Sequence, residues 1–261
     1  MIFMTQQPHA RLYEASYFHG DGSGYENYRS EFPAHYRSFR SRLNATQKIL
    51  GRMGRLLDVG CALGHCGKAA KDLGWDTYVT DVSPFAVNEA ARNFGLKASV
   101  APIDSLPFED RAFDCITLFD VIEHVSDPLS FLKEIRRTLR SDGIVQISTP
   151  DISSFTARIM GSKWYHYKPG EHLLYFNRKT LTSVLEVSGF EVIRIEALPI
   201  SMRFGDILKR LMRYWSSGFT IALRISEKLG LADKIINIYA GELQAWARPI
   251  NRDDRAQREA A

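Results

Sequence analysis

The stretch RLLDVGCALGHCGKAA, from Arg55 to Ala70, places an acid and closely spaced glycines after an apolar run. Glycines after a strand let the backbone approach a ligand closely, and the helix that follows points N–H groups at it. Asp81 ends the next apolar run, twenty-one positions after Gly60. A carboxylate there can accept hydrogen bonds from both hydroxyls of a ribose. The pattern favours a nucleoside ligand over the alternative that Asp81 caps a helix.

Three histidines are candidates for a general base. His124 lies in DVIEHVSDP, after the longest apolar run, and His166 and His172 lie in the segment WYHYKPGEH. A histidine near the reacting atoms can take a proton from a hydroxyl acceptor. The alternatives are that His124 orders its loop by hydrogen bonding, and that the later histidines pack in an aromatic cluster.

Two further sets of residues have types that could bind metal. Asp120, Glu123 and His124 are a weak candidate set for a hard divalent cation, because oxygen ligands suit such ions. The alternative is that they begin a helix. The cysteines Cys61, Cys66 and Cys115 lack zinc-ligand spacing, so no metal is expected there.

Strand-like and helix-like segments alternate around these residues. Strand-like RLLDV, DTYVTD, KASV, FDCITLFDV and GIVQISTP are separated mostly by helical patterns that begin near Ser83-Pro84 and Asp127-Pro128. Residues 178–188 are expected to be helical, followed by the strands FEVIRIEAL and GELQAWARPI. This alternation predicts crossovers and a parallel sheet in an α/β fold. The carboxyl ends of the strands would then gather the candidate residues at one edge.

The chain divides into three parts. Aromatic residues recur at spacings of three and four, which predicts a helix packed on the main domain: Tyr25, Tyr28, Phe32, Tyr36 and Phe39. We expect an N-terminal helical or lid segment over 1–50 and a main domain over 51–250, with a helical insertion at 203–236. The charged residues 251–261 are expected to be disordered.

Composition restricts the functional class. The chain has 261 residues, a net charge of +4 and 45% hydrophobic residues. This mild charge excess does not suggest nucleic-acid binding. Sparse cysteines and no evident leader favour the cytoplasm. No apolar run approaches the ~20 residues of a membrane span. The sequence leaves open a monomer or a homodimer.

Four segments together resemble a known family. LLDVGCALG, VTDVSPFAVNEA, LPFEDRAFDCITLFDVIEHVSDP and LRSDGIVQISTP are similar, in order, to the motifs of class I S-adenosylmethionine-dependent methyltransferases. The resemblance covers roughly Tyr13 to Pro249. It is nearest to the branch of ubiquinone-type O-methyltransferases and bacterial sugar and natural-product methyltransferases. It implies a Rossmann-like seven-stranded sheet, mostly parallel, with helices on both faces and the last strand antiparallel.

The resemblance also implies a cofactor, S-adenosyl-L-methionine, with S-adenosyl-L-homocysteine as product. The glycine turn would meet the methionine part, Asp81 the ribose, and Val82, Ile103 and Asp104 the adenine. Phe119 would lie near the sulfonium. The full set of expected cofactor-binding residues is Asp58, Gly60, Cys61, Ala62, Gly64, Asp81, Val82, Ile103, Asp104 and Phe119. Ubiquinone-type relatives hold a divalent cation with a set comparable to Asp120, Glu123 and His124.

Two residues depart from the family pattern. Ala62 stands where glycine is usual, which is tolerable if its φ stays negative. Pro102 stands where many relatives have an aspartate that binds the adenine amino group, and Asp104 could compensate.

The insertion carries the chain's charge excess. Residues 203–234 hold seven basic and three acidic residues, a net of +4 that equals the whole chain's. Apolar residues there share one helical face: Ile207, Leu208, Leu211, Met212 and Trp215. We expect helices that cap the acceptor pocket and bury Leu211 and Trp215. The alternative is a basic amphipathic helix that contacts an anionic membrane surface.

The sequence therefore predicts an S-adenosylmethionine-dependent methyltransferase that acts on an oxygen of a small-molecule or saccharide-like acceptor in biosynthesis. Two alternatives stay open. One is a non-catalytic cofactor-binding module of the same fold. The other is a nicotinamide-dependent oxidoreductase, whose G-x-G-x-x-G fingerprint is matched only by Ala62-x-Gly64-x-x-Gly67, with alanine in the first position.

Overall fold

The computed structural model describes residues 28, 31–212 and 215–250. One seven-stranded sheet runs through it in the order β3-β2-β1-β4-β5-β7-β6. The strands β1 to β5 are parallel, and β7 lies antiparallel between β5 and β6. The predicted fold class, mostly parallel with the last strand antiparallel, is confirmed. The strands are β1 (Arg55–Val59), β2 (Asp76–Asp81), β3 (Lys97–Val100), β4 (Phe113–Phe119), β5 (Leu139–Pro150), β6 (Phe190–Arg203) and β7 (Ile235–Pro249).

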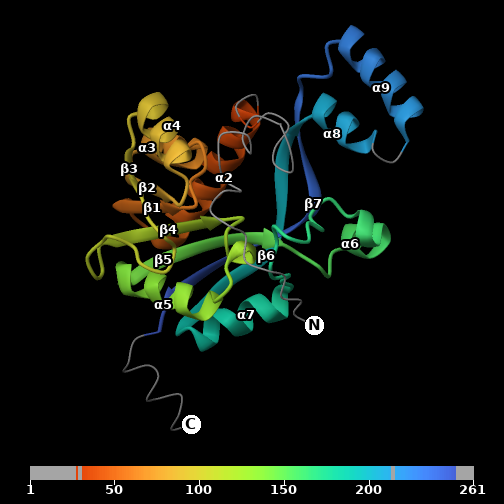
Figure 1. Cartoon of the computed structure of the whole chain (residues 1–261). Coiled ribbons are helices and arrows are strands. Elements are labelled where there is room, and N and C mark those ends of the chain that lie inside the picture. Colours follow the sequence, from red (N-terminus) through yellow and green to blue (C-terminus); the bar gives the residue numbers. More distant parts are fainter. Residues whose placement is uncertain (1–27, 29–30, 213–214, 251–261) are drawn as a thin grey trace.

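Helices cover both faces of the sheet (Figure 1). On one face α2 (Phe32–Leu50) and α3 (His65–Leu73) bury Leu43 and Ala70 against β1 and β4, with α4 (Pro84–Phe94) beside them. On the other face α5 (Pro128–Thr138) and α7 (Arg178–Val187) bury Phe131 and Leu181 in the larger core. The short elements η2 (Ile122–His124), α6 (Phe155–Met160) and η3 (Gly161–Lys163) follow the carboxyl ends of β4 and β5.

The helices α4 and α5 begin at the N-cap residues that the sequence predicts. The Ser83 side chain accepts a hydrogen bond from the Ala86 N–H, and Pro84 opens α4. Asp127 accepts from two backbone N–H groups of α5. Such caps satisfy donors that the first turn of a helix leaves unpaired. They fix where each crossover helix leaves the carboxyl edge of the sheet.

Buried polar contacts hold α2 against the sheet. The Trp246 indole N–H donates to the Thr46 hydroxyl over 2.7 Å, and that hydroxyl donates to Gln146 Oε1 over 2.6 Å. The helix is therefore joined to β5 and β7 by residues that lie 100 and 200 positions further along the chain. Tyr25, the expected lid and the expected disordered tail lie outside the described residues.

The insertion lies between β6 and β7 and projects from the body of the fold (Figure 1). It contains α8 (Phe204–Leu211) and α9 (Ser216–Lys228). The prediction that Trp215 is buried is wrong, because its side chain is 64% exposed. Leu208, not Trp215, carries the buried apolar contact of α8. Among the residues that the structure describes, no helix is both long and apolar enough to span a bilayer.

Candidate active site

The turn between β1 and α3 wraps over the end of β2. The N–H groups of Gly60 and Cys61 both donate to the Thr80 carbonyl, over 2.8 and 3.1 Å. The Ala62 N–H donates to Asp81 Oδ2 over 2.9 Å, and the Ser83 N–H donates to Oδ1 over the same distance. Burial raises the pKa of the Asp81 carboxyl, while these backbone donors oppose that shift. The carboxyl is thus held in one orientation beside the glycine turn.

Protein packing, as well as ligand approach, requires the glycines of this turn. Gly60 has φ +72°, and a Cβ there would lie 2.6 Å from Val121 Cγ2. Gly64 has φ +83°, and a Cβ would lie 2.7 Å from the Ala90 Cβ. The expectation that Ala62 keeps a negative φ is wrong, because its φ is +47°. A non-glycine residue in this left-handed region is strained by roughly 1–2 kcal/mol.

Asp58 lies buried at the end of β1. Its Oδ1 accepts a hydrogen bond from the Thr117 hydroxyl over 2.7 Å, and its Oδ2 has no hydrogen-bond partner among the described residues. Burial raises the pKa of this carboxyl to about 7. An unpaired buried oxygen is costly in a folded protein. A bound ligand or an ordered water would satisfy it, and this fits the cofactor role implied for Asp58.

The other residues expected to bind the cofactor lie along the same edge. The Ala101 N–H donates to the Asp81 carbonyl, which brings the turn that carries Ile103 and Asp104 beside Asp81 and Val82. Asp104 is exposed, and Ile103 packs against the larger core. Phe119 is covered from the α2 side, because its ring stacks on Phe39 with centroids 5.4 Å apart.

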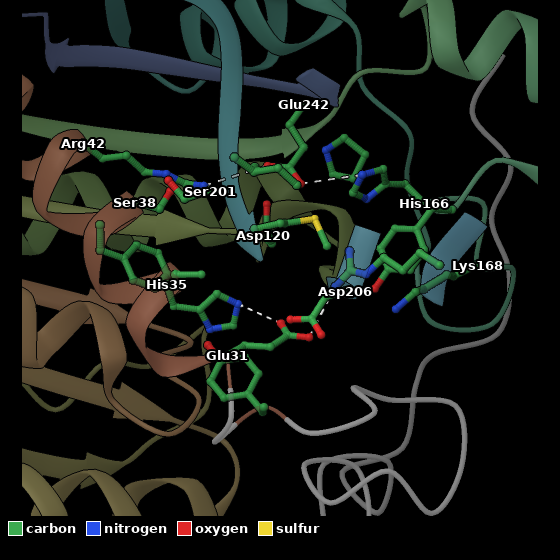
Figure 2. A pocket seen from close by; sticks show the side chains of 18 of the residues that line it. Glu31, His35, Ser38, Arg42, Asp120, His166, Lys168, Ser201, Asp206 and Glu242 are labelled. Carbon is green, nitrogen blue, oxygen red and sulfur yellow. Dashed lines mark hydrogen bonds and ion pairs between the residues drawn. The ribbon is translucent and has the colours of Figure 1, made fainter. Parts of the chain in front are cut away.

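A cavity of about 130 Å³ adjoins this edge, and Figure 2 shows its polar lining. Its walls come from α2, the end of β4, the segment 165–172, the β6–α8 junction and β7. Asp120 lies in the middle, Glu242 and His166 on one side of it, and Glu31 and His35 on another (Figure 2). The acidic, basic and histidine residues of the lining are Glu31, His35, Arg42, Asp120, Glu123, His124, His166, Lys168, His172, Arg203, Asp206, Arg210 and Glu242.

Tyr28 connects the cavity to the glycine turn. Its ring stacks on His65 with centroids 4.6 Å apart, packs with Leu63 and Ala86, and also lines the cavity. Burial and then the nearby Asp58 carboxylate raise the pKa of its phenol. The sequence had indicated Tyr28 only as an aromatic of a helix face. Its spacing carries no signal for this second role.

The structure brings all three candidate bases to the cavity. His124 Nδ1 lies 2.9 Å from the Glu171 carbonyl. A carbonyl only accepts, so Nδ1 carries the proton and Nε2 is the accepting nitrogen. The His124 and His172 rings meet edge to face with centroids 4.8 Å apart. Burial lowers the pKa of His124 and of His166 to about 4, and that of His172 to about 2, so all three are neutral at pH 7.

Two buried glutamates share the cavity with them. Glu123 accepts from the Thr149 hydroxyl over 3.0 Å, and Glu242 lies 3.6 Å from His166 and 4.0 Å from Arg42. Burial raises the pKa of both carboxyls. The sequence did not indicate Arg42 or Glu242, because each stands among ordinary residues of a helix or a strand. Only the packing of α2 against β7 brings them together.

The residues that could hold a cation differ from the expected set in one member. Within the described part of the chain, the group whose ligand atoms lie within 4.8 Å of one another is Glu123, His124 and His172. Asp120 is not in this group. It has φ +57°, and its Oδ1 accepts a hydrogen bond from the Ser148 hydroxyl over 3.0 Å. Although Asp120 is close to Glu123 and His124 in sequence, its carboxylate is therefore not close enough to share a cation with them.

Hydrogen bonds within the described residues do not satisfy every buried polar atom of the cavity. Five buried side-chain atoms have no hydrogen-bond partner within the part of the chain that the structure describes: Arg42 Nε, Glu123 Oε1, His166 Nε2, His172 Nδ1 and Glu242 Oε2. Native proteins pair most buried polar atoms. A concentration of exceptions in one cavity indicates a site that binds a polar ligand.

The matching family model is described as a methyltransferase domain, and it covers residues 25–195, more than half of the chain. A ubiquinone biosynthesis O-methyltransferase of Cereibacter sphaeroides is 32% identical over 117 residues, which are 42% of this chain and 47% of that protein. A second such enzyme, from Xanthomonas oryzae pv. oryzae, is 29% identical over 132 residues, 44% of this chain and 55% of that one. The chain thus spans about half the length of these relatives.

Solved structures share the fold. A Burkholderia thailandensis 1,6-didemethyltoxoflavin-N1-methyltransferase with bound S-adenosylhomocysteine aligns over 95% of this chain and 92% of its own, with a TM-score of 0.60 and 17% identity. A possible histamine N-methyltransferase of Thermotoga maritima aligns over 85% and 94%, with a TM-score of 0.55 and 20% identity. At such identities the likeness concerns the fold alone.

Proposed function

The chain belongs to the class I S-adenosylmethionine-dependent methyltransferases, and on that premise we propose that it methylates an oxygen of a small molecule bound in the cavity. S-adenosyl-L-homocysteine is the second product. The observation that carries the proposal is the position of Tyr28. One aromatic side chain contacts both the glycine turn and the cavity, so a cofactor on the turn and an acceptor in the cavity would be neighbours.

The cofactor would lie along the edge formed by β1 and β2. Asp81, held by two backbone N–H groups, is suited to accept hydrogen bonds from the ribose hydroxyls. Val82, Ile103 and Asp104 would border the adenine. The methionine part would meet Asp58 and the turn that contains Gly60, Cys61, Ala62 and Gly64, while Phe119 would stay near its sulfur. The unpaired Asp58 Oδ2 supports a polar ligand at this place.

S-adenosylmethionine supplies an electrophilic methyl group on a sulfonium. The chain's own contribution is to position the acceptor hydroxyl and to take its proton. We assign the proton to Nε2 of His124, because the Glu171 carbonyl fixes the opposite nitrogen as the donor. His172 and His166 are the other candidate bases. Each is neutral at pH 7, which is the form that a base must have before it takes a proton.

The cavity favours a polar, hydroxyl-bearing acceptor, of which a saccharide-like molecule is one kind. Its raised carboxyl pKa values favour protonated Glu123 and Glu242, which can both donate and accept hydrogen bonds. Arg42 adds a donor, and the histidines add acceptors and donors. An apolar acceptor would leave these buried atoms unpaired, at a cost of about 1–3 kcal/mol each.

Turnover with methyl-labelled S-adenosylmethionine and a host metabolite extract tests the proposal. We expect a labelled product that mass spectrometry identifies as an O-methyl compound, together with S-adenosylhomocysteine. Calorimetric titration should show binding of both forms of the cofactor and none of NAD. Cofactor binding without labelled product from any extract would favour a non-catalytic module, and NAD binding would favour an oxidoreductase.

A divalent cation is a secondary proposal at Glu123, His124 and His172. If a cation orients the acceptor, a chelator should abolish turnover and magnesium should restore it, while cofactor affinity stays unchanged. Full activity in the presence of a chelator would rule out the cation proposal and leave His124 as a simple base.

We also propose a cytoplasmic location, since Cys61, Cys66 and Cys115 are all buried free thiols.

A further inference from the structure

The insertion exposes an apolar stripe on α9. Ile221, Ile225 and Leu229 are 59%, 52% and 64% exposed, although large aliphatic side chains are usually buried. Their spacing of four residues places them on one side of the helix. Trp215, just before the helix, is 64% exposed as well. The stripe therefore runs along most of the outer face of α9.

The opposite side of α9 already has its packing partner. Leu223 approaches Gly205 of α8, since a Cβ on that glycine would lie 3.5 Å from Leu223 Cδ1. Ser226 is buried, and its carbonyl accepts the Leu231 N–H over 2.8 Å. The helix is thus fixed on α8 and on the segment that leads to β7. The stripe is not needed to complete this packing, so it is available for another surface.

Charge around the stripe identifies that surface. Arg224 and Lys228 are exposed, and both border the stripe because they lie three positions after Ile221 and Ile225. Residues 203–234 carry a net charge of +4, equal to that of the whole chain, and of their basic residues Arg203 and Arg210 line the cavity. An apolar stripe flanked by cations suits a helix that lies in the headgroup region of an anionic bilayer. A second copy would instead oppose two insertions of the same sign.

We propose that α9 docks this protein on an anionic lipid surface. The helix lies parallel to the bilayer, with the stripe among the upper acyl chains and Arg224 and Lys228 at the headgroups. Trp215 lies at the interface, where tryptophan is enriched in membrane proteins. The proposal is independent of methyl transfer, because docking needs neither cofactor nor acceptor.

Co-sedimentation of the full chain with vesicles tests this proposal. Vesicles of equal parts phosphatidylglycerol and phosphatidylcholine should bind the protein, and binding should weaken as salt is raised from about 0.05 to 0.5 M. Pure phosphatidylcholine should bind it at least about tenfold more weakly. Equal binding to both vesicles, or no binding to either, would overturn the proposal.

Two variants separate the stripe from the charge. The triple variant Ile221→Asn, Ile225→Asn, Leu229→Asn should lose vesicle binding. The double variant Arg224→Gln, Lys228→Gln should weaken binding to the anionic vesicles at least about tenfold. Both should keep the wild-type melting temperature and cofactor affinity, because all five side chains are exposed.

A matched control is Val187→Asn, which changes a 74% exposed apolar residue at the end of α7. It should bind vesicles like the wild type, and an equal loss there would show that the effect is not specific to α9. Sedimentation velocity without vesicles completes the test. A dimer that the triple variant converts to a monomer would assign the stripe to a second copy and overturn the proposal.

Discussion

The glycine turn and the cavity that we propose for the acceptor meet at the same edge of one sheet, yet they are built differently. The turn is a run of consecutive residues from Gly60 to Gly64, and its contacts are backbone N–H groups that bind Thr80 and Asp81. The cavity is formed by side-chain ends that come from positions as distant as Tyr28 and Glu242. Both oxygens of Asp81 accept hydrogen bonds, whereas five buried atoms of the cavity have no hydrogen-bond partner within the described residues.

The glycine turn is therefore a preformed site, whereas the cavity contains unsatisfied polar groups that a ligand could satisfy. Backbone amides hold the turn in shape before any ligand arrives. Unpaired buried groups cost about 1–3 kcal/mol each, and a matching acceptor would recover that cost when it binds. We therefore expect changes at the turn to alter cofactor affinity, and changes in the cavity to alter turnover.

The largest expected effect is on turnover, from the cavity. His124→Ala should lower kcat by roughly 10²–10⁴ if Nε2 takes the proton, because that is the usual contribution of a general base. Cofactor affinity should change little, since the His124 ring packs on His172 and lies beside the Glu171 carbonyl. Steady-state kinetics and calorimetry on the same preparation measure the two quantities.

His166→Ala and His172→Ala are the matched controls for that change. Near-normal turnover of His124→Ala, with a loss in one of these two, would transfer the base to the segment 165–172. A fall in cofactor affinity parallel to the fall in kcat would break the proposed separation of the two regions.

The next largest effect is on cofactor affinity, from the turn. Asp81→Ala should weaken S-adenosylmethionine binding at least about tenfold, because charge-assisted hydrogen bonds to the ribose are worth about 1.5–3 kcal/mol. Circular dichroism should confirm an intact fold. Asp104→Ala, an exposed residue at the same edge, should have a smaller effect. Unchanged affinity in Asp81→Ala would remove the ribose assignment.

The two regions should also respond to pH with opposite signs. Burial lowers the pKa of His166 to about 4, below the ordinary value of 6.5, so the unfolded state binds more protons between these values. Stability from this residue is lost as pH falls through that window. His166→Gln should therefore gain about 2 kcal/mol relative to the wild type between pH 7 and pH 5.

Asp58 provides the opposite case at the end of β1. Its folded pKa is raised to about 7 from an ordinary 3.8, so the folded state binds more protons and stability falls as pH rises through this range. Asp58→Asn should gain on the wild type as pH rises from 5 to 7. Urea unfolding at the two pH values measures both variants, and shifts of the same sign would contradict the assigned environments.

The smallest expected effect concerns strain in the turn. Ala62→Gly should raise the free energy of unfolding by up to about 1 kcal/mol, because glycine adopts φ +47° without the penalty of a Cβ. Ala91→Gly, in the interior of α4, should instead lower it by about 1 kcal/mol. Thermal melts of both variants decide, and equal destabilisation would show that Ala62 is unstrained.

The sequence by itself determined the sheet and the helix starts, and it predicted which residues gather along β1 and β2. These depend on local patterns: alternating apolar runs, Ser83 and Asp127 as caps, and glycines at a turn. Asp58 and Asp81 could be proposed because Asp58 is the last residue but one of β1 and Asp81 ends β2, and the carboxyl ends of parallel strands share one edge. The physical reason is that hydrogen bonds between near neighbours in the chain, or between adjacent strands, fix these features.

Only the tertiary structure decided the composition of the cavity, the ligand group at Glu123 and the exposure of α9. Arg42 and Glu242 meet across 200 residues of chain, and His172 takes the place beside Glu123 and His124 that the sequence had given to Asp120. Trp215 fits an amphipathic pattern, but a pattern does not say which apolar residues another element will cover. Burial depends on how whole elements pack against one another, and that packing is a property of the folded chain rather than of any short segment.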